Sequence, residues 1–139
     1  MRKIVILCIL LSVVSCKKQL SEEALTYLNG YWEIEAVEFP NGSTKEYTIS
    51  TTIDYISLTE MAGYRKKVYP QLNGKYKTSD DAEQFSIYKK DGVFFLVYGK
   101  NKEQWEEQLM AIDETSFSVK NNDQKIYHYK KFDSFNLIE

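Results

Sequence analysis

His128 is the single histidine in the sequence, and its imidazole is the side chain best suited to metal binding or to general base catalysis near neutral pH. It stands between Tyr127 and Tyr129 in a run typical of a strand, so a haem or metal ligand facing a cavity is one hypothesis. Such a site usually has a second histidine or a cysteine as ligand, and neither accompanies His128. No nucleophile elbow or oxyanion loop marks a serine that it would activate. We therefore expect no metal, no cofactor and no enzymatic activity, unless carboxylates converge beside His128 inside a cavity.

Two clusters of charged side chains could bind ions. Asp80-Asp81 with Glu83 presents oxygen ligands for a hard cation, but the spacing lacks the glycine and the bidentate acid of a calcium loop, which favours a solvated turn. The run Arg65-Lys66-Lys67 could bind an anionic group. On a strand its first and third members share one face while the second takes the other, so the three do not form one patch. We expect solvated charge at a rim.

Eleven tyrosines are the most unusual feature of the composition. The ring is apolar and its tip is polar, which suits a wet ligand cavity, a sugar-stacking face or a protein interface. Tyrosine also has a high preference for strands, so ordinary packing accounts for most single positions. The set as a whole favours an interaction surface.

The N-terminal segment is typical of an export signal. Met1-Arg2-Lys3 is basic, the run from Ile4 to Val14 is apolar and too short to span a bilayer comfortably, and Cys16 follows a small residue. The segment resembles a bacterial lipoprotein signal with its lipobox, which implies that Cys16 becomes the acylated N-terminus. Because Cys8 lies in the discarded run, the mature chain has no cysteine for a disulfide or a thiolate site.

Acyl chains on Cys16 would tether the protein to a membrane, since each buried CH₂ adds roughly 0.8 kcal/mol of membrane affinity. Lys17, in place of Asp, implies by resemblance sorting to the outer membrane, with the periplasmic and surface faces both open. The sequence thus divides into a signal peptide (1–15), a lipidated tether (16–20) and one domain (21–139).

The charge of the mature chain argues against nucleic acid as a partner. Removing Arg2 and Lys3 from the 18 basic side chains leaves 16, against 20 acidic ones. A net negative chain lacks the basic excess that binds phosphate backbones.

The domain has the turn pattern of an antiparallel meander. Asn73-Gly74 and Asp91-Gly92 accept the positive φ angles of tight hairpins. No long helical segment is available for crossovers, which disfavours a parallel sheet. A short helix is expected over 21–28, and strand-like runs cover 31–39, 45–49, 53–59, 64–72, 85–90, 93–98, 116–120 and 125–132. Residues 101–112 fit either a helix or a strand, and we favour the strand because it makes a hairpin with 116–120.

The opening of the first strand carries a resemblance to a known superfamily. In Gly30-Tyr31-Trp32, glycine permits the turn, and Trp32, Ile34 and Ala36 then alternate with two glutamates. This resembles the Gly-x-Trp turn of the lipocalin-like superfamily, whose tryptophan closes the base of a barrel and is covered by a basic residue of the last strand, here Lys130 or Lys131. The resemblance implies an all-β fold: an antiparallel up-and-down barrel, closed or nearly closed, of about eight or nine strands, with a short N-terminal helix.

These observations predict an outer-membrane-tethered lipoprotein that binds a small apolar or amphipathic ligand inside its barrel. Strand alternation predicts a pocket wall or barrel plug from five residues: Trp32, Ile34, Tyr76, Phe95 and Trp105. The alternative is a structural lipoprotein whose solid barrel docks an envelope protein complex through a tyrosine-rich outer face. A lumen with real volume favours the first hypothesis, and a packed lumen with an exposed aromatic patch favours the second.

Overall fold

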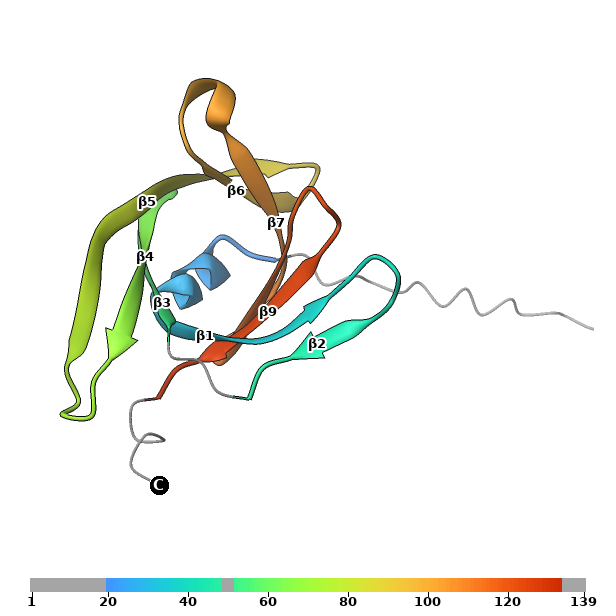
Figure 1. The fold of residues 1–139 in the computed structure, drawn as a ribbon. Helices are drawn as coiled ribbons and strands as arrows, with labels where there is room; N and C mark the ends of the chain where they lie inside the picture. The colour runs from blue at the N-terminus through green and yellow to red at the C-terminus, as the bar shows by residue number, and fades with distance from the viewer. Residues whose placement is uncertain (1–19, 49–51, 134–139) are drawn as a thin grey trace, which may run out of the picture.

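The computed structural model describes residues 20–48 and 52–133, which form an antiparallel β-barrel (Figure 1). The predicted lipidation site, Cys16, lies outside these residues. Within them, no helix is long and apolar enough to cross a membrane. The elements in chain order are η1 (Glu23–Leu28), β1 (Gly30–Glu38), β2 (Thr44–Glu46), β3 (Ile53–Thr59), β4 (Ala62–Pro70), β5 (Tyr76–Lys90), β6 (Val93–Tyr98), η2 (Asn101–Glu103), β7 (Trp105–Ile112), β8 (Ser116–Lys120) and β9 (Ile126–Lys131).

Closure of the barrel depends on β1, which pairs with strands on both of its sides. Its first residues, Gly30 to Trp32, pair with β3, and the stretch from Trp32 to Glu38 pairs with β9. The strands between follow in sequence order, each antiparallel to the one before. Eight strands, β1 and β3 to β9, thus form a closed ring. The short strand β2 lies outside this ring and pairs with the C-terminal end of β1. The predicted all-β, up-and-down barrel is confirmed.

The structure assigns strands to an ambiguous segment and to a segment that was predicted as a turn. Residues 105–112 form β7 after the short 3₁₀ turn η2, so the strand interpretation of this stretch is confirmed. The turn predicted around Asp80-Asp81 is wrong, because β5 begins at Tyr76 and runs through it with an irregular register against β4. The side chains described between Lys77 and Gln84 are exposed. The sequence of this part of β5 therefore lacks the alternation of apolar and polar residues from which a strand is predicted.

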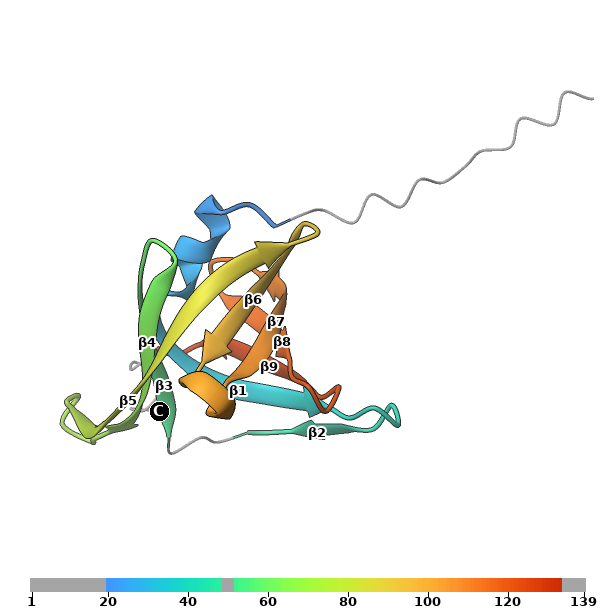
Figure 2. The same cartoon turned by 90° about the horizontal axis from the view of Figure 1, so that it is seen from above.

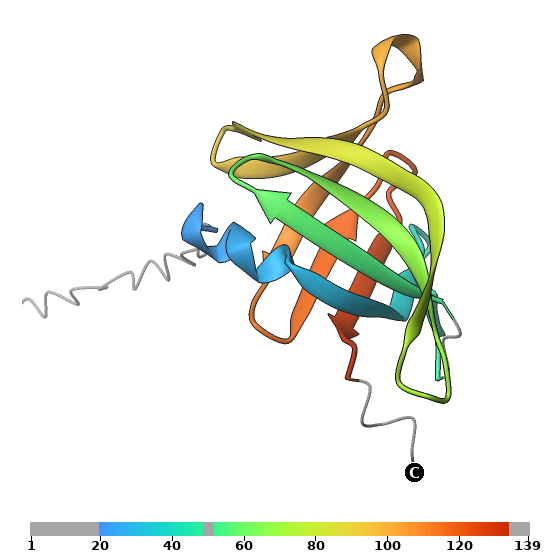
Figure 3. The same ribbon diagram turned by 90° about the vertical axis from the view of Figure 1, so that its left-hand side faces the viewer.

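The apolar core fills one end of the barrel and is closed by η1. Figures 2 and 3 show η1 at this end and the tip of the β4–β5 hairpin at the other. Leu25 and Leu28 of η1 are buried against inward-facing side chains of the strands. These include Trp32, Phe85, Ile87, Phe94, Leu96, Leu109, Phe117 and Val119. This end of the barrel is therefore packed solid.

Trp32 lies at the centre of that packing and is completely buried. Its indole N–H donates a hydrogen bond of 2.8 Å to the carbonyl of Leu28, and its ring meets the edge of Phe117 at 4.7 Å. Lys131 of the last strand places its ammonium 4.4 Å from the indole centroid. The same ammonium donates to the carbonyl of Asn29 at 2.8 Å. Gly30 has a φ of 126°, a conformation that allows the chain to turn from η1 into β1.

Candidate functional site

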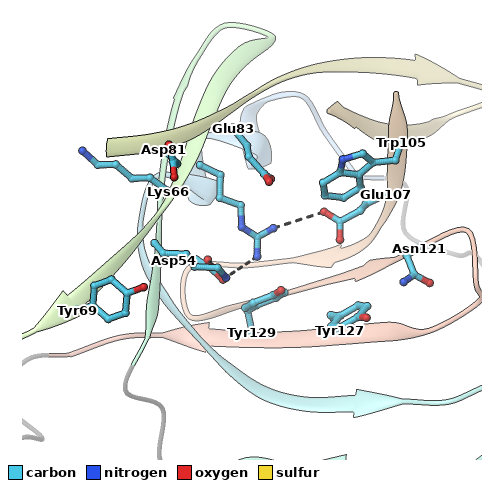
Figure 4. Close-up of a pocket in the computed structure, with 12 residues that line it drawn as sticks. Asp54, Lys66, Tyr69, Asp81, Glu83, Trp105, Glu107, Asn121, Tyr127 and Tyr129 are labelled. Carbon is cyan, nitrogen blue, oxygen red and sulfur yellow. Dashed lines mark hydrogen bonds and ion pairs between the residues drawn. The ribbon is translucent and has the colours of Figure 1, made fainter. Parts of the chain in front are cut away.

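A cavity of about 540 Å³ lies at the end of the barrel opposite η1 (Figure 4). Residues of β3, β4, β5, β7 and β9 line it, and Asn121 contributes from the turn before β9. The lining is Asp54, Arg65, Lys66, Lys67, Tyr69, Asp81, Glu83, Trp105, Glu107, Asn121, Tyr127 and Tyr129. Seven of these twelve side chains are ionisable acids or bases of Asp, Glu, Lys or Arg, so the cavity is polar in contrast to the apolar core behind it.

Arg65 occupies the floor of this cavity between two carboxylates. Its Nη2 lies 2.9 Å from Oδ2 of Asp54, and its Nη1 lies 3.6 Å from Oε1 of Glu107. The dashed lines of Figure 4 mark both ion pairs. The guanidinium also lies 5.0 Å from the ring centroid of Tyr129, and Nη1 is 3.4 Å from the Tyr98 hydroxyl. Arg65 is therefore held from several sides, and its side chain is 10% exposed.

The two floor carboxylates differ in their electrostatics. Burial alone would raise the pKa of Asp54, but the charges and hydrogen bonds of Arg65 and Lys67 outweigh it and hold that pKa below its ordinary value. Burial raises the pKa of Glu107, and the opposing effects of Arg65 and the Tyr98 hydroxyl do not fully offset it. Asp54 is thus the more firmly ionised of the pair.

The Oε1 atom of Glu107 is buried and accepts no hydrogen bond from any residue that the structure describes. The Glu107 side chain is 7% exposed, and the ion-pair contact to Arg65 at 3.6 Å is too long for a good hydrogen bond. Buried polar atoms are usually paired, so this oxygen is an exception that is compensated by the charge of Arg65 rather than by a hydrogen bond.

Trp105 supplies an aromatic wall beside Glu107. The two residues are two positions apart on β7 and therefore project from the same face of the strand. The indole stacks on Tyr98 with centroids 4.1 Å apart and an interplanar angle of 11°, while the residue remains 41% exposed. One ring face is held by the barrel, and Trp105 still offers surface to an occupant of the cavity.

Of the five side chains predicted as pocket wall or plug, Trp105 lines this cavity. Trp32 lies in the solid core, and Ile34 packs against that core, partly buried. Tyr76 stacks on Tyr31 at 4.6 Å, where it also meets the edge of Phe132. Phe95 stacks on the exposed Tyr88 at 5.1 Å, on the face of β6 opposite its buried side chains. The five residues are therefore not brought together.

The floor residues Asp54, Arg65 and Glu107 were not identified from the sequence. Arg65 was expected to be solvated at a rim, and this was wrong because Asp54 and Glu107 compensate its charge inside the barrel. Lys66 points the other way, with its ammonium 5.8 Å from the Tyr55 ring. One feature of the sequence could have identified the floor, namely an acidic residue on a strand face that is otherwise apolar. Asp54 shares its strand face with Ile56, and Glu107 shares its strand face with Leu109.

His128 lies outside this cavity, on the outer side of β9. Its Nδ1 is 2.8 Å from Oγ of Ser118, and its Nε2 is 2.9 Å from Oε2 of Glu38. The carboxylate that accompanies the histidine is thus 47% exposed on the surface rather than inside the barrel. Across residues 20–48 and 52–133, no group of three His, Cys, Asp or Glu side chains is placed to hold a metal ion.

Comparisons with known proteins give fold likenesses at low identity. No family model matches the chain, and no curated protein sequence matches it. One similar solved structure is a lipocalin-like protein from Bacteroides uniformis ATCC 8492, with a TM-score of 0.47, 8% identity, and coverage of 76% of this chain and 99% of that one. Another is an uncharacterized protein from Bacteroides eggerthii DSM 20697, with a TM-score of 0.48 and the same identity and coverage. At this identity the likeness concerns the fold alone.

Proposed function

We propose that this chain is a ligand-binding barrel, anchored through lipid on Cys16 to the outer membrane, that takes a small amphipathic molecule into the cavity at its open end. The tether rests on the sequence of residues 1–16, and the binding role rests on the cavity. The ligand places a polar group on the floor and an apolar body against the aromatic wall.

The observation that carries the binding role is the charged floor of the cavity. Taking Asp54, Arg65 and Glu107 out of water costs free energy that a filled apolar lumen would not cost. A cavity of about 540 Å³ beside such a cluster is large enough for a small molecule. Convergent polar groups that fix the orientation of a ligand are typical of binding sites, and here they lie beside the aromatic side chain of Trp105.

We propose binding rather than catalysis because of where the titratable groups lie. Both floor carboxylates are engaged by Arg65, which limits their freedom to exchange protons with an occupant. The single histidine projects from the outer side of the barrel, next to Ser118 and Glu38. Neither arrangement places a proton donor and a nucleophile together in the cavity.

Native mass spectrometry of the chain purified from the membrane of its own cells tests this function. We expect a stoichiometric small molecule on the wild type and its loss in Trp105→Ala. Met110→Ala is the matched control, because Met110 is on the same strand with the same 41% exposure and does not line the cavity. Retention of the molecule by Trp105→Ala, or a wild type that carries nothing, contradicts the proposal.

A second candidate function is protein docking, and an aromatic cluster favours it. The cluster consists of Tyr31, Tyr55, Tyr64, Tyr76 and Phe132, linked by ring contacts between 4.6 and 6.3 Å. All five are partly buried, which is more cover than an open docking patch usually has. An empty barrel that co-purifies with an envelope protein would favour this candidate over ligand binding.

A further inference from the structure

The two carboxylates that flank Arg65 are not equally compensated. Asp54 is contacted by two cations, since Arg65 lies on one oxygen and Lys67 on the other. Glu107 is contacted by one cation, at 3.6 Å, and its Oε1 accepts no hydrogen bond from the described residues. The negative charge of Asp54 is therefore better compensated than that of Glu107.

An occupant that brings a positive charge beside the Glu107 carboxylate removes this imbalance. An apolar group over Glu107 would displace water and leave the oxygen unsatisfied, which costs free energy. An anionic group would meet Glu107 together with the carboxylates of Asp81 and Glu83, which also line the cavity. The floor thus selects for a donor and against a carboxylate or a phosphate.

Charge favours a cationic donor over a neutral hydroxyl. The lining contains four carboxylates and three basic side chains, and the ammonium of one of these, Lys66, points away toward the Tyr55 ring, so the ionised cavity is net negative. Asp54 shows that a carboxylate of this floor accommodates two cations at once, Arg65 and Lys67. A ligand cation on Glu107 would reproduce that arrangement on the other side of Arg65.

Trp105 is placed to receive the same cation. It projects from β7 on the same side as Glu107, and Figure 4 shows both side chains on one wall of the cavity. A cation within about 6 Å of an indole centroid is attracted by the ring electrons. Arg65 over Tyr129, at 5.0 Å, shows this contact already in use in the barrel.

We propose that the cavity binds an amphipathic amine, whose ammonium pairs with the carboxylate of Glu107 and whose apolar body lies against Trp105. This inference rests on the proposed ligand-binding function and names the chemical class of its ligand.

Calorimetric titration with three ligands that share one phenyl group tests the amine: phenethylamine, phenethyl alcohol and hydrocinnamate. The protein is the full chain as cells process it, at neutral pH, in nonionic detergent if it purifies with membranes. We expect the amine to bind about tenfold more tightly than the alcohol, the size of a partly desolvated cation–π and ion-pair contact, and the carboxylate to bind most weakly.

Two variants locate the preference. Glu107→Gln keeps the shape of the side chain and is expected to lower the affinity for the amine to that for the alcohol. Glu106→Gln is the matched control, since it removes the neighbouring carboxylate, which accepts from the Tyr88 hydroxyl at 2.7 Å and does not line the cavity. It is expected to keep the full preference. A folded Glu107→Gln protein that still prefers the amine overturns the inference.

The ligand series on the wild type decides the question even if Glu107→Gln does not fold. Equal affinity for amine and alcohol, tighter binding of hydrocinnamate, or binding of none of the three overturns the amine. A molecule without an amine group that co-purifies in native mass spectrometry also overturns it, while the proposed ligand-binding function stands.

Discussion

The guanidinium of Arg65 lies 2.9 Å from the carboxylate of Asp54 inside the barrel, where the two side chains are 10% and 7% exposed. They belong to neighbouring strands, β4 and β3, and the pairing of those strands brings them together. Breaking a buried pair by removing one partner leaves an uncompensated charge in a low dielectric. This pair therefore ties the stability of the barrel to the floor of its cavity.

Arg65→Met is expected to lower the free energy of unfolding by about 3–5 kcal/mol, because Asp54 and Glu107 would both lose a cation. Urea denaturation followed by circular dichroism measures the change. Lys66→Met is the control, since the next residue of β4 points away from the floor and over the Tyr55 ring. Its loss should stay below about 1 kcal/mol, the usual worth of a surface charge. Equal losses in the two variants would contradict the buried pair.

The opposite pKa shifts of the two floor carboxylates predict an unfolding free energy that is highest at mildly acidic pH. The lowered pKa of Asp54 contributes stability that is present above about pH 4 and is lost as the pH falls through the folded-state value. The raised pKa of Glu107 contributes stability that is full below about pH 4 and is lost as the pH rises through its folded-state value. The unfolding free energy should therefore be highest at a pH where Asp54 is fully ionised in both states and Glu107 is still largely protonated in the folded state.

Urea denaturation at a series of pH values checks this profile. In Glu107→Gln the decline on the neutral side should disappear, and the loss on the acid side should remain. Glu106→Gln should keep both limbs, because that carboxylate lies outside the cavity lining. A neutral-side decline that survives in Glu107→Gln would assign it to another group.

The strands were predictable from the sequence because turn residues and a period of two fix them locally. The ranges 53–59, 93–98 and 116–120 agree with β3, β6 and β8. The direction in which each side chain points was less predictable. In β6 the run from Val93 to Tyr98 is apolar at every position, so alternation does not decide whether Phe94 or Phe95 faces the core.

The cavity floor could not be assembled from the sequence for a different reason. Its three charged residues come from β3, β4 and β7, and the partners of Arg65 are set by barrel closure rather than by spacing along the chain. Arg65 next to two lysines has the local pattern of solvated charge, and its burial follows from its partners alone. Trp105 was among the five wall residues predicted from strand alternation alone, and alternation does not show which of the five lie together.

The two tryptophans are expected to differ sharply in their contribution to stability. Trp32→Ala should lower the unfolding free energy by about 3–5 kcal/mol, because it empties the centre of the core and leaves the Leu28 carbonyl without its donor. Trp105→Ala should lose much less, since the residue is 41% exposed at the cavity mouth. Chemical denaturation of both variants makes the comparison. A loss below about 1 kcal/mol for Trp32→Ala would contradict its role as the plug of the barrel.

Membrane attachment is predicted to depend on Cys16 and not on Cys8, although both cysteines lie near the N-terminus. In the proposed lipoprotein, the thiol of Cys16 would accept an acyl chain, whereas Cys8 would belong to the signal peptide that is removed. Cys16→Ser should therefore move the protein out of the mature membrane fraction, as a soluble protein or an uncleaved precursor, and abolish incorporation of a palmitate analogue. Cys8→Ser should leave both unchanged. Fractionation that is the same in the two variants, with no acyl label on the wild type, would contradict the lipid anchor. It would not affect the proposal that the barrel binds a ligand, because that proposal rests on the cavity.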